Sequence, residues 1–102
     1  MKWNQLMAVG ALAAITGSSF AQAMDPLQLR SLAASCANCH GTAGIAEPGN
    51  ESLAGVKKDE LLKKMMDFKT GKKPATIMHQ LAKGYTDEQL VALAGYFSAL
   101  KK

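Results

Sequence analysis

The stretch Cys36-Ala37-Asn38-Cys39-His40 decides how this chain folds. Its cysteines are the only two in the 102-residue sequence, and a histidine follows the second one directly. In a helix, thiols three positions apart lie about one turn apart, so both can form thioethers with the vinyl groups on one edge of a porphyrin. The histidine then offers an imidazole nitrogen to the iron. The pattern C-x-x-C-H therefore predicts the covalent attachment of one c-type haem.

Three other roles for these residues compete with haem attachment. A disulfide between Cys36 and Cys39 would enclose only two residues, which constrains the unfolded chain little and strains the bond geometry. A thioredoxin-like pair should follow a strand and open a helix, whereas this pair is expected to close one. A zinc site could recruit His79, but the adjacency of Cys39 and His40 departs from the separated ligand pairs of zinc sites.

The N-terminal residues have the organisation of a secretory signal peptide. Lys2 precedes an apolar run over residues 6–15, and the segment ends in Ala21-Gln22-Ala23, a small-x-small cleavage pattern. The apolar run is shorter than the roughly twenty residues that span a bilayer, which weighs against an uncleaved anchor. We therefore expect a signal peptide over residues 1–23, cleavage after Ala23, export to the periplasm and no stable membrane insertion. Residues 24–102 would form one domain.

Helical periodicity without a strand pattern or a repeat predicts an all-α domain. Asp25 is a candidate cap for a first helix, with Pro26 in its first turn and Gln28 completing a capping-box pattern. This helix is expected to end near the haem-binding motif. Glycine and proline then predict a loop over residues 41–55.

Three more helices are expected, over residues 58–68, over residues 76–82 and from Thr86 onward. In the first of them, Asp59 with Lys63 and Glu60 with Lys64 are candidate ion pairs one turn apart. The last helix has the clearest start, because Gln89 completes a capping box with Thr86. Its inward stripe consists of Leu90, Leu93, Ala94, Phe97 and Leu100.

An iron held by His40 has a second axial position. The mature chain offers Met24, Met65, Met66, Met78 and His79 as candidates. Met78 precedes the final helix, so its segment can fold over the other face of a haem, and a thioether suits an electron carrier. Adjacent helical residues point about 100° apart, so only one of Met78 and His79 can face the iron. The residues alone favour Met78 and leave His79 open.

The order of these motifs resembles the class I cytochrome c family over essentially the whole mature chain. The matching features are the motif with Gly41, the stretch Ser52-Leu53-Ala54-Gly55, Met78, and a final helix that ends in Gly95-Tyr96-Phe97. The segment over residues 76–87 is more particular and is similar to the cytochrome subunit of flavocytochrome c sulfide dehydrogenases.

The resemblance implies a small class I cytochrome c-like helical fold wrapped around one covalently attached haem c. It implies thioethers at Cys36 and Cys39, His40 as the proximal iron ligand and Met78 as the distal one. The implied function is single-electron transfer, without catalysis, as the electron-accepting subunit or partner of an FAD-containing, sulfide-oxidising flavoprotein. The alternatives are a free-standing carrier for another periplasmic dehydrogenase or terminal oxidase, and a haem sensor or catalytic haem with an open distal site.

One position departs from the family pattern. Many class I cytochromes carry a proline shortly before the Ser-Leu-Ala-Gly stretch, and its carbonyl orients the proximal histidine. Glu51 occupies that place here, and Pro48 lies three residues earlier. An acceptor for the second imidazole nitrogen of His40 is still expected, but the sequence does not say which carbonyl supplies it.

Positive charge is concentrated in one part of the chain. The precursor has a formal net charge of +4, and removal of Lys2 would leave +3. Lys69, Lys72, Lys73 and Lys83 bracket the expected distal-ligand segment. A positive rim there would steer the protein toward redox partners with an acidic docking surface. Nucleic-acid binding is not expected, because no surface of interleaved aromatic and basic residues is present.

Overall fold

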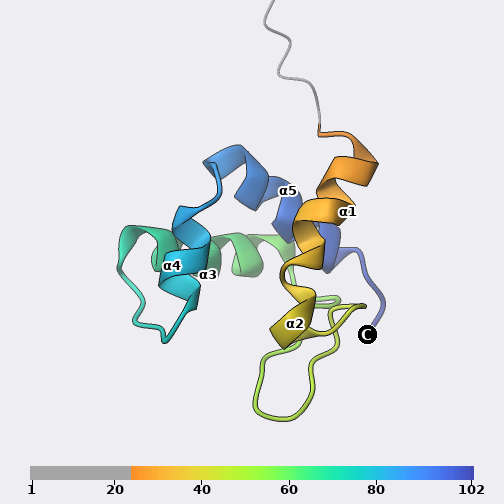
Figure 1. Ribbon diagram of the computed structural model, residues 1–102, viewed down its shortest axis with the longest axis horizontal. Coiled ribbons are helices and arrows are strands. Elements are labelled where there is room, and N and C mark those ends of the chain that lie inside the picture. Colours follow the sequence, from red (N-terminus) through yellow and green to blue (C-terminus); the bar gives the residue numbers. More distant parts are fainter. Residues whose placement is uncertain (1–23) are drawn as a thin grey trace, which may run out of the picture.

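The computed structural model describes residues 24–102, so the predicted signal peptide and its cleavage site lie outside the described residues. The helices are α1 (Pro26–Ala34), α2 (Ala37–His40), α3 (Lys58–Thr70), α4 (Met78–Lys83) and α5 (Asp87–Ser98). Over this range the chain contains helices, turns and loops but no strand, which confirms the all-α prediction. Figure 1 shows α4 at the left in front of α3, and α1 and α2 at the right, one above the other.

The first expected helix is divided into α1 and α2 by a tight turn. The Ser35 hydroxyl donates to the Leu32 carbonyl (2.9 Å), and Cys36 N–H donates to the Ala33 carbonyl three residues back (3.0 Å). Such local bonds compete with the regular i→i−4 ladder and end the helix. The start also differs from the prediction. The Asp25 carboxylate accepts from Leu27 N–H, without the expected reciprocal bond from Gln28 within the described residues.

Helix α3 begins at the expected residue, Lys58, and continues two residues beyond the expected end, to Thr70. Its C-cap is Gly71, which adopts the left-handed conformation (φ 82°, ψ 6°) that favours glycine. The predicted ion pairs were wrong in their partners. Lys63 pairs with Asp67, one turn later (2.6 Å), and Lys64 pairs with Glu51 in the preceding loop. Both lysines therefore bind carboxylates other than Asp59 and Glu60.

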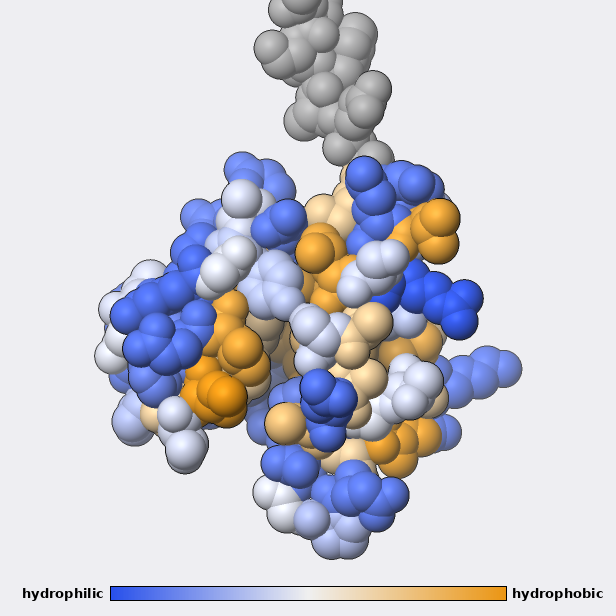
Figure 2. Space-filling view, viewed as in Figure 1, coloured by the Kyte–Doolittle hydropathy of each residue, from blue (hydrophilic) through white to orange (hydrophobic). Residues whose placement is uncertain are grey.

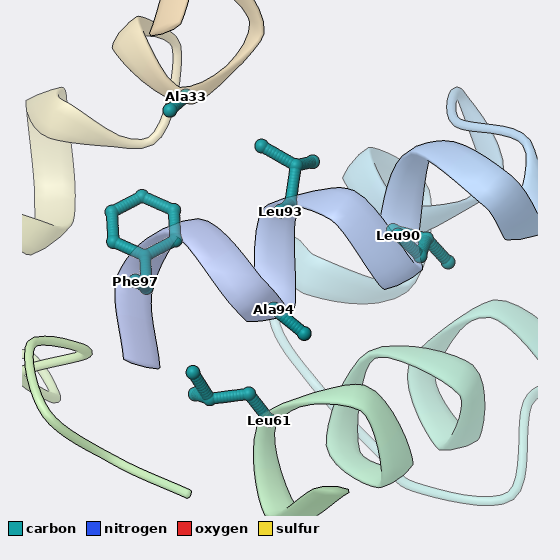
Figure 3. Packing of buried hydrophobic residues seen from close by; sticks show 6 residues of the cluster. All are labelled: Ala33, Leu61, Leu90, Leu93, Ala94 and Phe97. Atoms are coloured by element: carbon teal, nitrogen blue, oxygen red, sulfur yellow. The ribbon is translucent and has the colours of Figure 1, made fainter. Parts of the chain in front are cut away.

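Helix α5 supplies most of the buried core. The predicted capping box is confirmed, because Gln89 N–H donates to the Thr86 hydroxyl and the Gln89 side chain accepts from Thr86 N–H. Figure 3 shows its inward side chains meeting Ala33 from α1 and Leu61 from α3. The buried residues of the cluster are Ala33, Leu61, Leu90, Leu93, Ala94 and Phe97. Three helices that are distant in sequence thus share one apolar core.

The loop between α2 and α3 is fixed to the core by backbone bonds. The Gly44 carbonyl accepts from the N–H groups of Leu53 (2.7 Å) and Ala54 (3.0 Å), and Gly55 N–H donates to the Phe97 carbonyl of α5 (3.0 Å). Gly41 begins this loop with φ 84° and ψ 150°, a region that is essentially restricted to glycine. A Cβ at Gly41 would also lie 1.9 Å from the Ile45 carbonyl oxygen. The residue after His40 must therefore be glycine.

Candidate functional site

A cavity of about 350 Å³ lies where the haem-binding motif, α3, α4 and α5 meet. Figure 2 shows this face hollowed between the part that carries α4 and the part that carries α1 and α2, with hydrophobic residues along the hollow. The lining is largely apolar, with the motif residues and a few polar groups at its edge. The lining residues are Ser35, Cys36, Cys39, His40, Asn50, Glu51, Leu53, Leu61, Lys64, Met65, Phe68, Ala75, Thr76, Ile77, Met78, Leu81, Tyr85, Leu93, Ala94 and Phe97.

The motif contributes both of its cysteines and its histidine to this cavity. Cys36 caps α2 with helical backbone angles (φ −78°, ψ −20°), so Cys36 and Cys39 are separated by one turn of helical backbone. Both are free thiols; Cys36 is half-buried and Cys39 is exposed. Burial raises the pKa of the Cys36 thiol above its usual value, and a contact with the Ser35 hydroxyl opposes this effect. The Cys36 thiol is therefore protonated at neutral pH.

The imidazole of His40 is oriented by the backbone of Glu51. The distance between His40 Nδ1 and the Glu51 carbonyl oxygen is 2.5 Å. Because a carbonyl can only accept, Nδ1 carries the proton and donates this bond. The other ring nitrogen, Nε2, then has a free lone pair, as a metal ligand requires. Glu51, which stands where the resemblance to class I cytochromes c implies a proline, thus supplies the acceptor that the sequence left undetermined.

Met78 and His79 lie differently with respect to the cavity. Met78, the first residue of α4, lines the cavity, whereas His79 does not. The Nδ1 atom of His79 is buried without a hydrogen-bond partner in the described part of the chain. The structure therefore brings Cys36, Cys39, His40 and Met78 together around one cavity and leaves His79 outside it. Of the other candidate methionines, Met65 also lines the cavity, whereas Met24 and Met66 do not.

Two side-chain contacts at the cavity were not anticipated from the sequence. The Ser35 and Tyr85 hydroxyl oxygens lie 2.6 Å apart and connect the end of α1 to the segment between α4 and α5. The Glu51 carboxylate pairs with Lys64 of α3. Both contacts join residues that are more than ten positions apart, and no sequence periodicity links such pairs. One indication that Glu51 matters was visible in the sequence, because Glu51 stands where the family pattern has a proline.

Lys69 does not belong to a free positive rim, which corrects the sequence-based expectation. Its ammonium group donates to the Tyr85 carbonyl (2.8 Å) and to the Asp87 carboxylate (2.7 Å). It thereby connects α3 to the start of α5. The remaining lysines of the expected rim, Lys72, Lys73 and Lys83, are exposed and have no ion pair among the described residues.

The competing roles of the motif have little support in this geometry. Cys36 and Cys39 form no disulfide. The motif follows α1, not a strand, unlike a thioredoxin-like pair. Across residues 24–102, no group of three or more histidine, cysteine, aspartate or glutamate side chains is placed to hold a metal ion. His79 therefore does not complete a zinc site with the motif.

The residues around the cavity fit a covalently bound haem. The donor set combines two free thiols, an imidazole whose Nδ1 proton is already committed, and a thioether. Haem iron is commonly held by histidine together with methionine in cytochromes c. The apolar side chains that line the cavity would cover the faces of a porphyrin. A disulfide would leave the imidazole and the thioether without a role, and residues 24–102 contain no group of side chains placed for a tetrahedral metal site.

Comparisons with known proteins agree with this fit. The chain is 36% identical over 100 residues to a protein named as the cytochrome subunit of sulfide dehydrogenase from Chlorobaculum tepidum, which covers 95% of this chain and 91% of that protein. It is 37% identical over 98 residues to cytochrome c-553 of Helicobacter pylori, covering 94% and 96%. It is 35% identical over 89 residues to cytochrome c-553 of Nitratidesulfovibrio vulgaris, covering 82% and 84%.

No protein-family model matches the chain. Between residues 24 and 102, no helix has the length and apolar character needed to cross a membrane. The relatives nevertheless cover nearly the whole chain, and their names agree with the donor set around the cavity. The chain belongs to the cytochrome c family, as a small c-type cytochrome that carries electrons.

Proposed function

We propose that this protein is a periplasmic monohaem cytochrome that transfers single electrons. In this proposal, Cys36 and Cys39 hold the haem through thioethers, His40 is the proximal iron ligand and Met78 is the distal one. The observation that carries the proposal is the shared cavity, because all four side chains line it while His79 does not. The chain has one C-x-x-C-H motif, which accounts for one haem. Met65 also lines the cavity, but it packs against the core cluster, whereas Met78 begins the segment before the last helix.

The bound haem would supply an iron that gains and loses one electron reversibly. The protein holds the iron-binding side chains in place. His40 is oriented by the Glu51 carbonyl, and Met78 is placed by the first turn of α4, which packs on α3. With both side chains positioned before an electron arrives, little would need to rearrange when the iron is reduced or oxidised. With haem bound, the apolar part of the lining would shield the iron from water and so limit solvent reorganisation.

We further propose that the electron donor is a sulfide-oxidising flavoprotein, with this chain as its electron-accepting subunit or partner. The support is the relative named as the cytochrome subunit of sulfide dehydrogenase. The exposed Lys72, Lys73 and Lys83 lie close in sequence to the Met78 segment, so their charges favour a partner with acidic groups around its electron exit. A free-standing carrier is the second candidate, supported by the two relatives named cytochrome c-553.

Residues 1–23 act in this proposal as an export signal. The support is the basic start, the short apolar run and the Ala21-Gln22-Ala23 ending. N-terminal sequencing of the exported protein should begin at Met24. An intact Met1 in a membrane fraction would instead indicate an anchored cytochrome.

The central experiment tests covalent attachment at the motif. The chain is expressed with a haem-attachment system, as the wild type and as the Cys36→Ala/Cys39→Ala variant. Mass spectrometry of the wild type should show one haem that survives acid–acetone extraction, and the double variant should retain none. Ser35→Ala is the matched control, since Ser35 lines the cavity without offering a thiol, and it should keep its haem. A wild-type protein that folds with two free thiols and no haem would contradict the proposal.

A further inference from the structure

We propose that the ion pair between Glu51 and Lys64 positions His40, and that it replaces the stiffness that a proline would give to the histidine-orienting loop. This inference rests on the proposed function, because it concerns His40 as an iron ligand. It assigns a role to two residues outside the iron-binding set. Both of them line the same cavity as His40.

The orienting carbonyl belongs to a residue whose backbone is not fixed by its chemistry. A proline locks φ near −65°, whereas glutamate rotates freely about this bond. The loop is secured on both sides of Glu51, by Ala46 N–H donating to the Ser52 hydroxyl (2.9 Å) and by Leu53 N–H donating to the Gly44 carbonyl (2.7 Å). The N–H of Glu51 itself donates no hydrogen bond in the described part of the chain. The peptide group before Glu51 can therefore still rotate between these two bonds, and the Glu51 side chain is the other group of this residue that could restrain it.

The Glu51 side chain provides that restraint. Its carboxylate pairs with the Lys64 ammonium, thirteen residues later on α3. Helix α3 is anchored in the core by Leu61, so Lys64 extends from a fixed base. The Lys64 side chain is 33% exposed, compared with 76% for the neighbouring Lys63, which pairs with Asp67 within the same helix. Of these two lysines, only Lys64 connects α3 to the loop that orients His40.

Glu51 links His40 to α3, because its carbonyl binds His40 Nδ1 and its carboxylate binds Lys64. One residue holds α3 with its side chain and the imidazole with its carbonyl, so motion of Glu51 loosens both. The bond from Nδ1 fixes the ring orientation and leaves the opposite nitrogen free to bind the iron. An ion pair of this exposure adds little to global stability. Its effect should therefore appear locally, as a change in how often the Nδ1 bond opens.

The test measures solvent exchange of the His40 Nδ1 proton by NMR in the haem-loaded, reduced protein. Lys64→Met should accelerate this exchange by up to about fivefold, the change that corresponds to losing an exposed ion pair. Lys64→Arg keeps the charge and should exchange like the wild type. Lys63→Met is the matched control, because it breaks an ion pair on the same helix that does not reach the loop, and it should also exchange like the wild type.

A double-mutant cycle then tests the route from Lys64 to His40. Glu51→Gln should accelerate exchange as much as Lys64→Met does, and the double variant should add nothing further, because both changes break the same contact. Additive effects, or equal exchange in Lys64→Met and Lys63→Met, would overturn the inference. Such a result in a protein with normal haem attachment and reversible reduction would leave the proposed function intact, so the two failures are distinguishable.

Discussion

The two sides of the cavity are held in different ways. On the side of His40, the contacts join residues that are eleven and thirteen positions apart, through the Glu51 carbonyl and the Glu51–Lys64 pair. On the side of Met78, the bonds around the start of α4 are local, from the N–H groups of Gln80 and Leu81 to the Ile77 carbonyl. Ile77 begins this helix without a side-chain cap and is 54% exposed.

This difference predicts that Met78 is more mobile than His40, the two side chains that we propose as iron ligands. Local opening requires the fewest broken contacts where a segment is short, exposed and held by bonds to its own neighbours. The start of α4 fits this description, because Ile77 is exposed and follows a loop that contains Gly71 and Pro74, whereas the rest of α4 packs on α3 and includes the buried Ala82. We therefore expect the distal side to open and exchange ligands first, while His40 stays bound.

The largest effect is expected from Met78→Ala. Loss of the thioether should open the iron to cyanide and carbon monoxide and lower the reduction potential, since axial ligands adjust haem potentials over a range of roughly 0.8 V. The weak far-red absorption band of a sulfur–iron bond should disappear from the oxidised protein. Titration with cyanide and a potentiometric titration measure both effects.

His79→Ala is the matched control for this substitution, because the two residues are adjacent and only Met78 lines the cavity. Its spectrum and potential should remain close to those of the wild type. If Met78→Ala keeps the far-red band, or if His79→Ala loses six-coordination, then the assignment of the distal ligand is wrong and the comparison between the two sides must be rebuilt.

The sequence predicted the parts of this site that depend on spacing along the chain. The motif places Cys36, Cys39 and His40 within one short helical segment, and the capping box of α5 was visible in Thr86 and Gln89. The location of Met78 at the cavity also followed from its place before the last helix. Local geometry accounts for the motif and the capping box, whereas the choice of Met78 over His79 depended also on the resemblance to class I cytochromes c.

The sequence could not predict contacts that arise only after the chain has folded back on itself. Lys64 was expected to pair with Glu60, one turn away, yet it binds Glu51, which the loop brings nearby. Lys69 was assigned to a free rim, yet it holds the start of α5 through Tyr85 and Asp87. Each choice depends on which carboxylate or carbonyl the tertiary fold places within reach of a long side chain.

A smaller effect, on the free energy of unfolding, is expected when Gly41 or Gly71 is replaced by alanine. Gly41, next to His40, has φ 84° and ψ 150°, and a Cβ there would clash with the Ile45 carbonyl oxygen. Gly71, in the loop before Met78, has φ 82° and ψ 6°, with no atom within 4 Å of the added Cβ.

Gly41→Ala should therefore destabilise the haem-loaded protein by about 3 kcal/mol or more, from backbone strain together with the clash. Gly71→Ala should cost about 1–2 kcal/mol, from strain alone. Urea denaturation followed by circular dichroism measures both. Equal losses would show that the loop beside His40 yields as readily as the segment before Met78.

The smallest effect concerns Asp67, which restrains the distal side. Its carboxylate pairs with Lys63 (2.6 Å), and its backbone carbonyl accepts from Lys73 N–H (3.1 Å). The hydrogen bond from Lys63 lowers the pKa of Asp67 below its ordinary value, and the charges of Lys63, Lys72 and Lys73 act in the same direction.

Because the folded-state pKa of Asp67 is lowered, the ion pair contributes fully to stability above the unfolded-state pKa, about 3.9. That contribution is lost as the pH falls through the folded-state pKa. Asp67→Asn should therefore lower the urea midpoint slightly at pH 7, and the difference from the wild type should shrink below about pH 4. Lys63→Met removes the principal cause of the shift and should reproduce most of this pH dependence. A difference that stays constant from pH 7 to pH 3 would show that the charge of Asp67 contributes nothing, because the substitution keeps the backbone carbonyl that binds Lys73 N–H.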